Sequence, residues 1–369
     1  MRKTKINIGI IGGGINSTIG KAHISALNMD GNFNIVSGFF SRSKKDNLKT
    51  INKFRFNNFK IYKNLDNYIK NEKEYLDCFL VLTDTHSHFQ VINKLINLNK
   101  IIICEKPSTG NLKEIVSLNN KIKKNKIKYY PFYNYLGYPI INDIKYFITK
   151  NKIGKIHNID IEMNQQAMTK NKIKKIKKWR LKDFSLPTVQ LDLGVHTLCL
   201  LNYFQPLTKI NKLISREQNI DKNNLIHSVE TWLEFNSQIN SRITISKYKI
   251  GQRNNLNIKI YGDTGSLYWE HVNPEILVFF DNNGKKSVLD RNDSILLNSQ
   301  DPIVNRYSVG HPYGFIESMA NYYQNIHKSI LSKNGDKVKN LVNIEDEINI
   351  LKIIQHSHSS SKNTKWIKL

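Results

Sequence analysis

The sequence predicts an α/β protein of two domains: a doubly wound parallel sheet, followed by an α+β domain with a large, mostly antiparallel sheet. The chain has 369 residues, more than the roughly 250–300 that one hydrophobic core usually serves. Up to about residue 130, short apolar runs alternate with helical stretches, which is typical of parallel sheets. Longer segments of period-two character follow. We therefore expect one domain over residues 1–130 and a second over residues 131–369.

In the first domain, short apolar runs predict the strands. The run at 6–11 ends in glycines, which suits a strand buried on both faces of a parallel sheet. The other strands are expected at 36–40, 76–83 and 101–104, and helices are expected at 19–29, 86–98 and 112–118.

In the second domain, alternating apolar and polar residues predict a sheet flanked by helices. The helices are expected near 138–150, 188–204, 312–331 and 343–357. The strands are expected at 156–163, 226–236, 241–249, 256–261, 266–270 and 275–281. Turn residues at 262–265 separate two of these strands.

The chain is strongly basic, with a formal net charge of +26. A basic surface can serve nucleic acid, anionic lipid or an acidic substrate. The alternative, which we favour, is that lysine simply fills solvated positions throughout the chain. The basic runs at 121–128 and 170–178 are interleaved with Ile and Asn and lack the aromatics on which bases stack. We therefore expect no nucleic-acid partner.

The three cysteines, Cys78, Cys104 and Cys199, lie in apolar runs without metal or redox spacing. Free cysteines of this kind are usually buried and suit a reducing compartment, so we expect a cytoplasmic protein without a metal site. No stretch approaches the roughly 20 apolar residues of a membrane span, and we expect no membrane partner.

A glycine cluster, Gly12-Gly13-Gly14, lies between the first predicted strand and the first predicted helix. Glycines here let the backbone turn tightly and approach a pyrophosphate at a helix N-terminus. The strict G-x-G-x-x-G spacing is not met, because Ser17 stands where the third glycine belongs; Gly20 is expected to take the helix-packing role. A plain glycine turn is the alternative, but the strand–loop–helix context favours a Rossmann-type dinucleotide site.

Glu105-Lys106-Pro107 follows the predicted strand at 101–104. Ligands of doubly wound sheets bind beyond the carboxyl ends of the strands, so Lys106 is expected to point into the cofactor crevice. The alternative is a surface lysine in a turn, which is a serious competitor in a chain with 56 Lys and Arg residues.

Asp192 and His196 lie four residues apart in an apolar stretch. If this stretch is helical, both side chains are on the same helix face. A carboxylate that orients an imidazole is a common arrangement for proton transfer. A buried histidine satisfied by a local aspartate agrees equally well with the spacing.

Together these segments resemble the glucose–fructose oxidoreductase / inositol dehydrogenase (Gfo/Idh/MocA) family, and the likeness extends over nearly the whole chain. The segments that carry it are Gly-Ile-Ile-Gly-Gly-Gly at 9–14, Gly-Phe-Phe-Ser-Arg at 38–42, Leu82-Thr-Asp-Thr-His-Ser-His88, Glu105-Lys-Pro107, Trp179-Arg180, Asp192-Leu-Gly-Val-His196, Tyr261-Gly-Asp-Thr-Gly265 and His311-Pro-Tyr-Gly-Phe-Ile-Glu317.

The resemblance implies an NAD(P)-dependent oxidoreductase that acts on a CH–OH group of a sugar, cyclitol or sugar nucleotide. His196 would accept a hydroxyl proton while hydride leaves the same carbon for the nicotinamide. Lys106 would bind the substrate oxygen and help to place the nicotinamide, and Asp192 would hold the substrate and the histidine. These three side chains are expected to converge on one cleft between the domains. The resemblance also implies a cis Lys106–Pro107 bond and places Tyr135 in the substrate pocket.

The residues that the resemblance implies as cofactor contacts are Gly12, Gly13, Gly14, Ser41, Arg42, Thr83, His88, Glu105, Trp179 and Arg180. Two positions depart from the family pattern: Asp84 stands where proline is frequent, and Leu200 stands where many relatives carry aspartate. Neither departure removes a catalytic group, but the second makes it unsafe to transfer a substrate from any one relative.

The cofactor is expected to be NADP or NAD, with a lean towards NADP. The second predicted strand ends at Phe40 without the carboxylate that accepts the ribose hydroxyls in NAD sites. Ser41 and Arg42 follow, and both could hold a 2′-phosphate. In relatives that use NAD, an arginine here can stack on adenine instead.

The second hypothesis is a cofactor-binding sensor or scaffold with the same fold. The complete set of Lys106, Asp192 and His196 argues against it, since a pure binding module needs no proton acceptor beside a hydride site. A homo-oligomer, dimer or tetramer, is expected from the resemblance.

Overall fold

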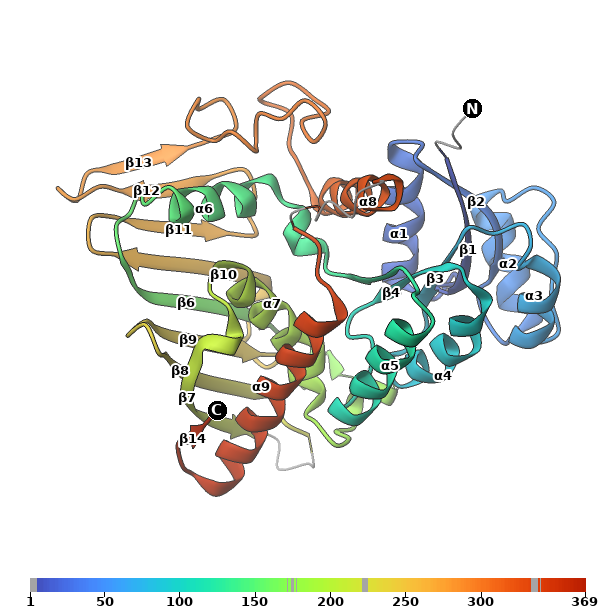
Figure 1. The fold of residues 1–369 in the computed structure, drawn as a ribbon, viewed down its shortest axis with the longest axis horizontal. Coiled ribbons are helices and arrows are strands. Elements are labelled where there is room, and N and C mark those ends of the chain that lie inside the picture. The colour runs from blue at the N-terminus through green and yellow to red at the C-terminus, as the bar shows by residue number, and fades with distance from the viewer. Residues whose placement is uncertain are drawn as a thin grey trace. The chain divides into compact units, whose positions relative to one another are not determined.

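The computed structural model describes residues 5–170, 172–173, 176, 178–220, 225–332, 338 and 340–369. The chain divides into two compact units (Figure 1). The first comprises Met1–Gly137 and Phe315–Glu347, and the second comprises Tyr138–Gly314 and Ile348–Leu369. The segment from Phe315 to Glu347 thus groups with the first unit, whereas the sequence boundary at residue 130 assigned it to the second domain.

The first unit contains a parallel five-stranded sheet in the order β2-β1-β3-β4-β5. Its strands are β1 (Ile6–Gly12), β2 (Phe33–Phe39), β3 (Cys78–Leu82), β4 (Ile101–Glu105) and β5 (Tyr129–Phe132). Every residue of β3 is buried, as expected for a central strand covered on both faces. The doubly wound parallel sheet predicted from the sequence is confirmed, with β5 as an additional strand.

Helices connect these strands. They are α1 (Thr18–Met29), α2 (Lys44–Phe54), α3 (Leu65–Glu72), α4 (Thr85–Leu95) and α5 (Leu112–Lys124), joined later in the chain by α8 (Phe315–Leu331). Short 3-10 turns lie at η1 (Ile96–Leu98) and η2 (Asn134–Gly137). Helix α8 packs on α1, where the Tyr323 hydroxyl lies 2.6 Å from His23 Nδ1. This contact explains why α8 belongs to the first unit.

The second unit contains a nine-stranded sheet in the order β13-β12-β11-β10-β6-β9-β8-β7-β14. Its strands are β6 (Ile156–Gln165), β7 (Ile210–Gln218), β8 (Ser228–Phe235), β9 (Asn240–Ser246), β10 (Arg253–Gly262), β11 (Ser266–Glu270), β12 (Leu277–Phe280), β13 (Lys286–Leu289) and β14 (Ile367–Lys368). All neighbours are antiparallel except β6 and β9. The predicted α+β domain with a large, mostly antiparallel sheet is confirmed.

One face of this sheet carries helices α6 (Pro139–Thr149), α7 (Val195–Phe204) and α9 (Ile344–Asn363) (Figure 1). Helix α9 begins in the first unit and continues in the second. Its Ser360 hydroxyl accepts a hydrogen bond from the Ser215 amide of β7 at 3.0 Å. Fully buried Trp269 of β11 packs on Tyr138, the residue before α6. The helix-covered face of this sheet therefore holds the core of the second unit.

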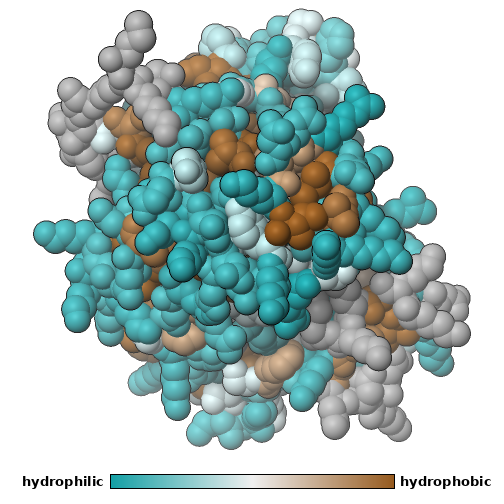
Figure 2. Space-filling view, turned by 90° about the vertical axis from the view of Figure 1, so that its right-hand side faces the viewer, coloured by the Kyte–Doolittle hydropathy of each residue, from teal (hydrophilic) through white to brown (hydrophobic). Residues whose placement is uncertain are grey.

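One face of the molecule is mainly polar: Figure 2 shows that hydrophilic residues dominate it and that apolar residues form separate patches. Among the described residues, no helix is both long and apolar enough to cross a membrane. The three cysteines are free and buried, and burial raises the pKa of the Cys78 and Cys104 thiols.

Candidate active site

The glycine loop between β1 and α1 packs closely against the neighbouring backbone. Gly12 has a φ of +84°, and a Cβ at this position would lie 2.7 Å from the backbone of Leu82 and Thr83. A Cβ on Gly20 would lie 2.0 Å from the Gly13 carbonyl oxygen, so Gly20 has the close-packing role predicted for it. The helix begins at a Ser17 cap, whose side chain accepts a hydrogen bond from the Gly20 amide.

The turn after β2 is held by Asn47. The side-chain oxygen of this buried residue accepts hydrogen bonds from the amides of Phe40 at 2.9 Å and Ser41 at 3.2 Å. The Ser41 hydroxyl accepts a hydrogen bond from the Ser43 amide, and Arg42 is exposed. No carboxylate occupies the end of β2 in the described structure, since Phe39 and Phe40 stand there.

The turn after β3 presents Thr83. Its buried hydroxyl has no hydrogen-bond partner in the described part of the chain. Asp84, which departs from the family pattern, caps α4 by accepting hydrogen bonds from the Ser87 amide and hydroxyl. Asp84 therefore has a local structural role as the helix cap.

His88 of α4 lies beneath these turns. Its ring nitrogens contact the carbonyl oxygens of Pro107 at 2.9 Å and Thr83 at 3.0 Å. Burial lowers the pKa of this imidazole, and the two carbonyl contacts oppose that shift. His88 thus ties the turn after β3 to the turn after β4.

Strand β4 ends at Glu105, and the turn that follows contains Lys106 and the predicted cis Lys106–Pro107 bond, which is present. One Glu105 oxygen lies 2.8 Å from His23 Nε2, and the other accepts a hydrogen bond from the Lys106 amide at 3.2 Å. The carboxylate therefore contacts both helix α1 and the backbone that carries Lys106.

A buried carboxyl group lies behind the same turn. Glu347 accepts hydrogen bonds from the Ser108 amide at 3.1 Å, the Ser108 hydroxyl and the Tyr133 hydroxyl at 3.0 Å. Tyr129 donates to the Ser108 hydroxyl at 2.6 Å. Burial raises the pKa of Glu347 from 4.5 to about 7, so this carboxyl group titrates near neutral pH.

In the second unit, Asp192 lies in a π-helical turn (Gln190–Gly194), and His196 lies in the first turn of α7. The sequence predicted a helix here but not the π turn. Such turns are frequent at functional sites, because they displace side chains from the regular helical register. His196 is 6% exposed, and the Asp192 side chain is 19% exposed.

Asp192 faces two cations. Its Oδ2 atom lies in close contact with Lys247 Nζ and 3.5 Å from Arg180 Nη1. The predicted partner Trp179 precedes Arg180, but its side chain lies outside the described structure, as do Lys174, Lys175 and Lys177 of the basic run. Tyr135 lies buried in the first unit, in η2.

The structure thus gathers two sets of predicted residues. The glycine loop and the turns after β2, β3 and β4 share the carboxyl edge of the parallel sheet, where ligands of such sheets bind. Asp192, His196 and Arg180 lie in the second unit. The convergence of Lys106 with Asp192 and His196 stays a prediction.

Sequence reasoning missed His23, Glu347 and Lys247. Their partners are 82, 239 and 55 residues away in the chain, so no local spacing marks them. Among the described residues, no group of three or more histidine, cysteine or acidic side chains is placed to hold a metal.

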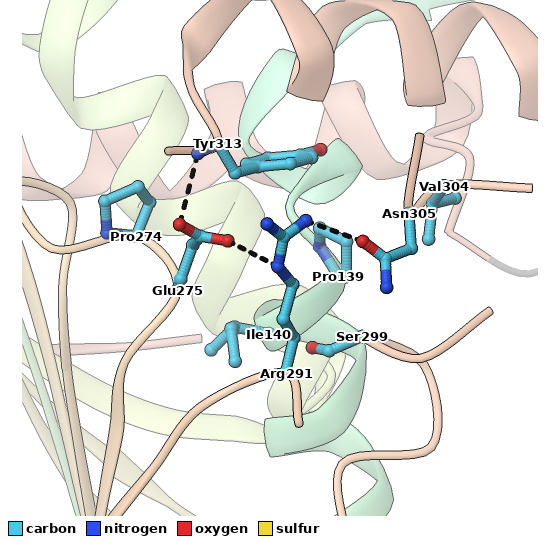
Figure 3. Close-up of a pocket in the computed structure, with 9 residues that line it drawn as sticks. All are labelled: Pro139, Ile140, Pro274, Glu275, Arg291, Ser299, Val304, Asn305 and Tyr313. Carbon is cyan, nitrogen blue, oxygen red and sulfur yellow. Dashed lines mark hydrogen bonds and ion pairs between the residues drawn. The ribbon is translucent and has the colours of Figure 1, made fainter. Parts of the chain in front are cut away.

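A small cavity of about 20 Å³ lies elsewhere in the second unit (Figure 3). Arg291 crosses it, pairing with Glu275 at 2.8 Å and donating to Asn305 at 2.6 Å. The volume suits about one water molecule. We assign this cavity a structural role in anchoring the loop that follows β13.

Comparison with known proteins identifies the family. The family model described as "oxidoreductase family, NAD-binding Rossmann fold" matches residues 6–133, and its companion, the C-terminal alpha/beta domain, matches residues 145–369. The chain belongs to the Gfo/Idh/MocA oxidoreductase family. The protein is therefore an oxidoreductase with an NAD-binding Rossmann domain, as the resemblance implied. No curated protein sequence matches it.

Solved structures of low identity share its fold. An oxidoreductase from Sinorhizobium meliloti is 20% identical, with a TM-score of 0.86 over 99% of this chain and 100% of that one. An inositol dehydrogenase homologue from Azotobacter vinelandii, complexed with NADH and myo-inositol, is 21% identical, with a TM-score of 0.88 over 100% and 98%. A levoglucosan dehydrogenase complexed with NADH and levoglucosan is 16% identical, with a TM-score of 0.81 over 99% of each chain.

The carboxyl edge of the parallel sheet fits a dinucleotide. The glycine at position 12 lets the loop pack directly on the backbone at the end of β3, and α1 begins just after this loop, where a helix N-terminus can receive a phosphate group. The orphaned Thr83 hydroxyl is a polar group that a bound ligand would satisfy.

Proposed function

We propose that the Gfo/Idh/MocA protein is an NAD(P)-dependent dehydrogenase or reductase acting on a CH–OH group of a sugar, cyclitol or sugar nucleotide. The observation that carries the proposal is the placement of Asp192 on a π-helical turn directly before the α7 turn that holds His196, in a chain whose other unit matches an NAD-binding Rossmann family model. The myo-inositol and levoglucosan named for two proteins of the same fold support this substrate class.

The chain's own residues have distinct tasks in this reaction. A bound nicotinamide would accept hydride from the alcohol carbon or return it to a carbonyl carbon. His196 accepts the hydroxyl proton during oxidation and returns it during reduction. Lys106 holds the substrate oxygen through its ammonium group. Asp192 holds the substrate and limits the movement of His196.

The proposed cofactor contacts retain the predicted set. Gly12, Gly13 and Gly14 receive the pyrophosphate, and Ser41 with Arg42 receives the adenosine ribose or its 2′-phosphate. The remaining members are Thr83, His88, Glu105, Trp179 and Arg180, of which His88 and Glu105 act through the turns that they hold. Tyr135 is proposed to line the substrate pocket.

We retain NADP as the favoured cofactor. In NAD sites a carboxylate at the end of the second strand accepts the ribose hydroxyls, and Phe39 and Phe40 stand there instead. Arg42 is exposed beside this position, where a guanidinium can pair with a phosphate.

We also propose a cytoplasmic homo-oligomer, a dimer or tetramer. Free, buried thiols suit a reducing compartment. Light scattering coupled to size-exclusion chromatography would test the assembly: a monomer mass at all concentrations contradicts it.

The activity is tested by screening sugars, cyclitols and nucleotide sugars with NAD⁺ and NADP⁺, following the reduced nicotinamide at 340 nm. Turnover that is lost in His196→Ala supports the proposal. Cofactor binding without turnover of any substrate would favour the alternative, a non-catalytic sensor or scaffold.

A further inference from the structure

Lys247 is an unusual lysine. Of the lysine side chains that the structure describes, it alone is buried, with 2% of its surface exposed. It follows directly after strand β9, and Lys249, two residues later, is exposed. Burial of an ammonium group costs several kcal/mol unless an anion and hydrogen bonds compensate, so this placement requires a specific partner.

The backbone of Lys247 is held from two sides. Its amide donates to the His227 carbonyl oxygen, and its carbonyl oxygen accepts from the Met168 amide, each at 2.9 Å. These bonds join the segment after β6 to the segment before β8. The side chain therefore starts from a rigid position.

The partner of the side chain is Asp192. The Nζ atom of Lys247 donates a hydrogen bond to Asp192 Oδ2, the atom that Arg180 approaches to 3.5 Å. Asp192 belongs to a π turn. In such a turn, regular α-helical hydrogen bonds do not define the direction of the side chain. An ion pair to a rigid strand end determines where the Asp192 carboxylate lies.

The electrostatic consequence concerns His196, which begins the next helical turn. An unneutralised carboxylate nearby favours imidazolium, whereas a carboxylate paired with an ammonium group does so less. The ion pair with Lys247 therefore weakens the effect of the Asp192 charge on the imidazole.

We propose that Lys247 is a positioning residue of the active site, which acts through Asp192 to fix the carboxylate on the π turn and to limit the basicity of His196. This inference rests on the proposed function and adds to it a residue outside the predicted catalytic set.

The experiment compares Lys247→Met, which removes the charge at similar volume, with Lys249→Met as the matched exposed control. Lys247→Met should lower kcat/KM by about 10–10³-fold, less than the roughly 10²–10⁴-fold expected for losing the general base itself. In the profile of kcat/KM against pH, the acid limb should move to higher pH by about 0.5–1 unit, the size expected for one partly screened charge. Lys249→Met should match the wild type. An unchanged profile and rate in a folded Lys247→Met would overturn the proposal.

A double-mutant cycle tests the route through Asp192. If Lys247 acts through this carboxylate, the double variant Lys247→Met/Asp192→Asn should have a kcat/KM no lower than that of Asp192→Asn alone. The double variant also removes both charges of the pair, which leaves neither without its partner, so it should fold even where the single variant is unstable. If the fold-loss of kcat/KM in the double variant equals the product of the two single-variant losses, the proposal is contradicted.

A substrate-independent measurement separates this inference from the proposed function. The NMR titration of His196, assigned with His196→Gln, should show a pKa about 0.5–1 unit higher in Lys247→Met than in the wild type. An unmoved titration in the folded variant overturns the role of Lys247. Absence of turnover in the wild type, with the titration shifted, would instead contradict only the proposed function.

Discussion

His23 Nε2 lies 2.8 Å from Glu105 Oε1, which joins the helix after the glycine loop to the turn that carries Lys106. The histidine is fully buried and Glu105 is 12% exposed. The second Glu105 oxygen accepts the Lys106 amide hydrogen bond. One carboxylate thus aligns the proposed cofactor loop with the proposed substrate lysine.

Glu105→Ala should destabilise the first unit by about 1–3 kcal/mol, because the buried His23 loses a hydrogen-bond partner. Urea unfolding measures the difference. Glu74→Ala, at a side chain that is 75% exposed, should cost less than about 0.5 kcal/mol. Equal effects of the two changes would mean that the His23 contact contributes nothing to stability.

Glu347 should make stability depend on pH. Its pKa is about 7 in the folded protein, against 4.5 ordinarily, so the native state binds the proton more tightly. The contribution is fully present below pH 4.5 and is lost as the pH rises to about 7. The loss amounts to about 3 kcal/mol for such a shift.

Glu347→Gln should remove this pH dependence. The measurement is the free energy of unfolding of wild type and variant at pH 5 and pH 7.5, and the gap between the two proteins should change with pH. A constant gap would mean that Glu347 does not titrate in this range.

His196→Ala should lower kcat by about 10²–10⁴-fold, the usual cost of losing a positioned general base. Cofactor affinity should stay nearly unchanged. Lys106→Ala should reduce both turnover and substrate binding, because its ammonium group acts on the substrate oxygen in the ground and transition states. Steady-state kinetics with a substrate from the screen tests both variants; normal turnover of His196→Ala would assign the base to another group.

Arg42→Ala should distinguish the two cofactors. An NADP enzyme should lose roughly 1.5–3 kcal/mol of NADP binding, the value of a hydrogen bond to a charged group, while NAD binding barely changes. Dissociation constants for both cofactors provide the test, with exposed Lys45 changed to Ala as the control. Equal losses would mean that Arg42 contacts the adenine or ribose, and the NADP assignment would fail.

Gly12→Ala should be much more harmful than Gly31→Ala. Both glycines have positive φ, +84° and +67°, but only Gly12 has backbone within 3 Å of a new Cβ; Gly31 has nothing within 4 Å. The clash should add roughly 1–3 kcal/mol of destabilisation and weaken cofactor binding. Unfolding curves and cofactor titrations of both variants measure this, and similar results for the two would show that the loop can relax.

The α/β fold class, the parallel sheet, the glycine loop and the family were all predictable from the sequence alone. These features are local or periodic: burial on both faces requires continuous apolar runs in strands such as β3, and close packing at Gly20 requires a residue without a Cβ. The additional strand β5 and the helices α2 and α3 were not predicted: β5 has only four residues, and the buried residues of α2 are the polar Asn47 and Thr50, which give no apolar face to recognise.

Tertiary structure alone decided which distant residues complete the site. The π turn at Gln190–Gly194, the grouping of α8 with the first unit, and the partners His23–Glu105 and Lys247–Asp192 leave no local signal. Each depends on which segments, distant in sequence, lie side by side in the fold. The pairings also depend on the cost of burying a charged or polar group without a partner. That cost selects the pairings only after the fold has brought the segments together.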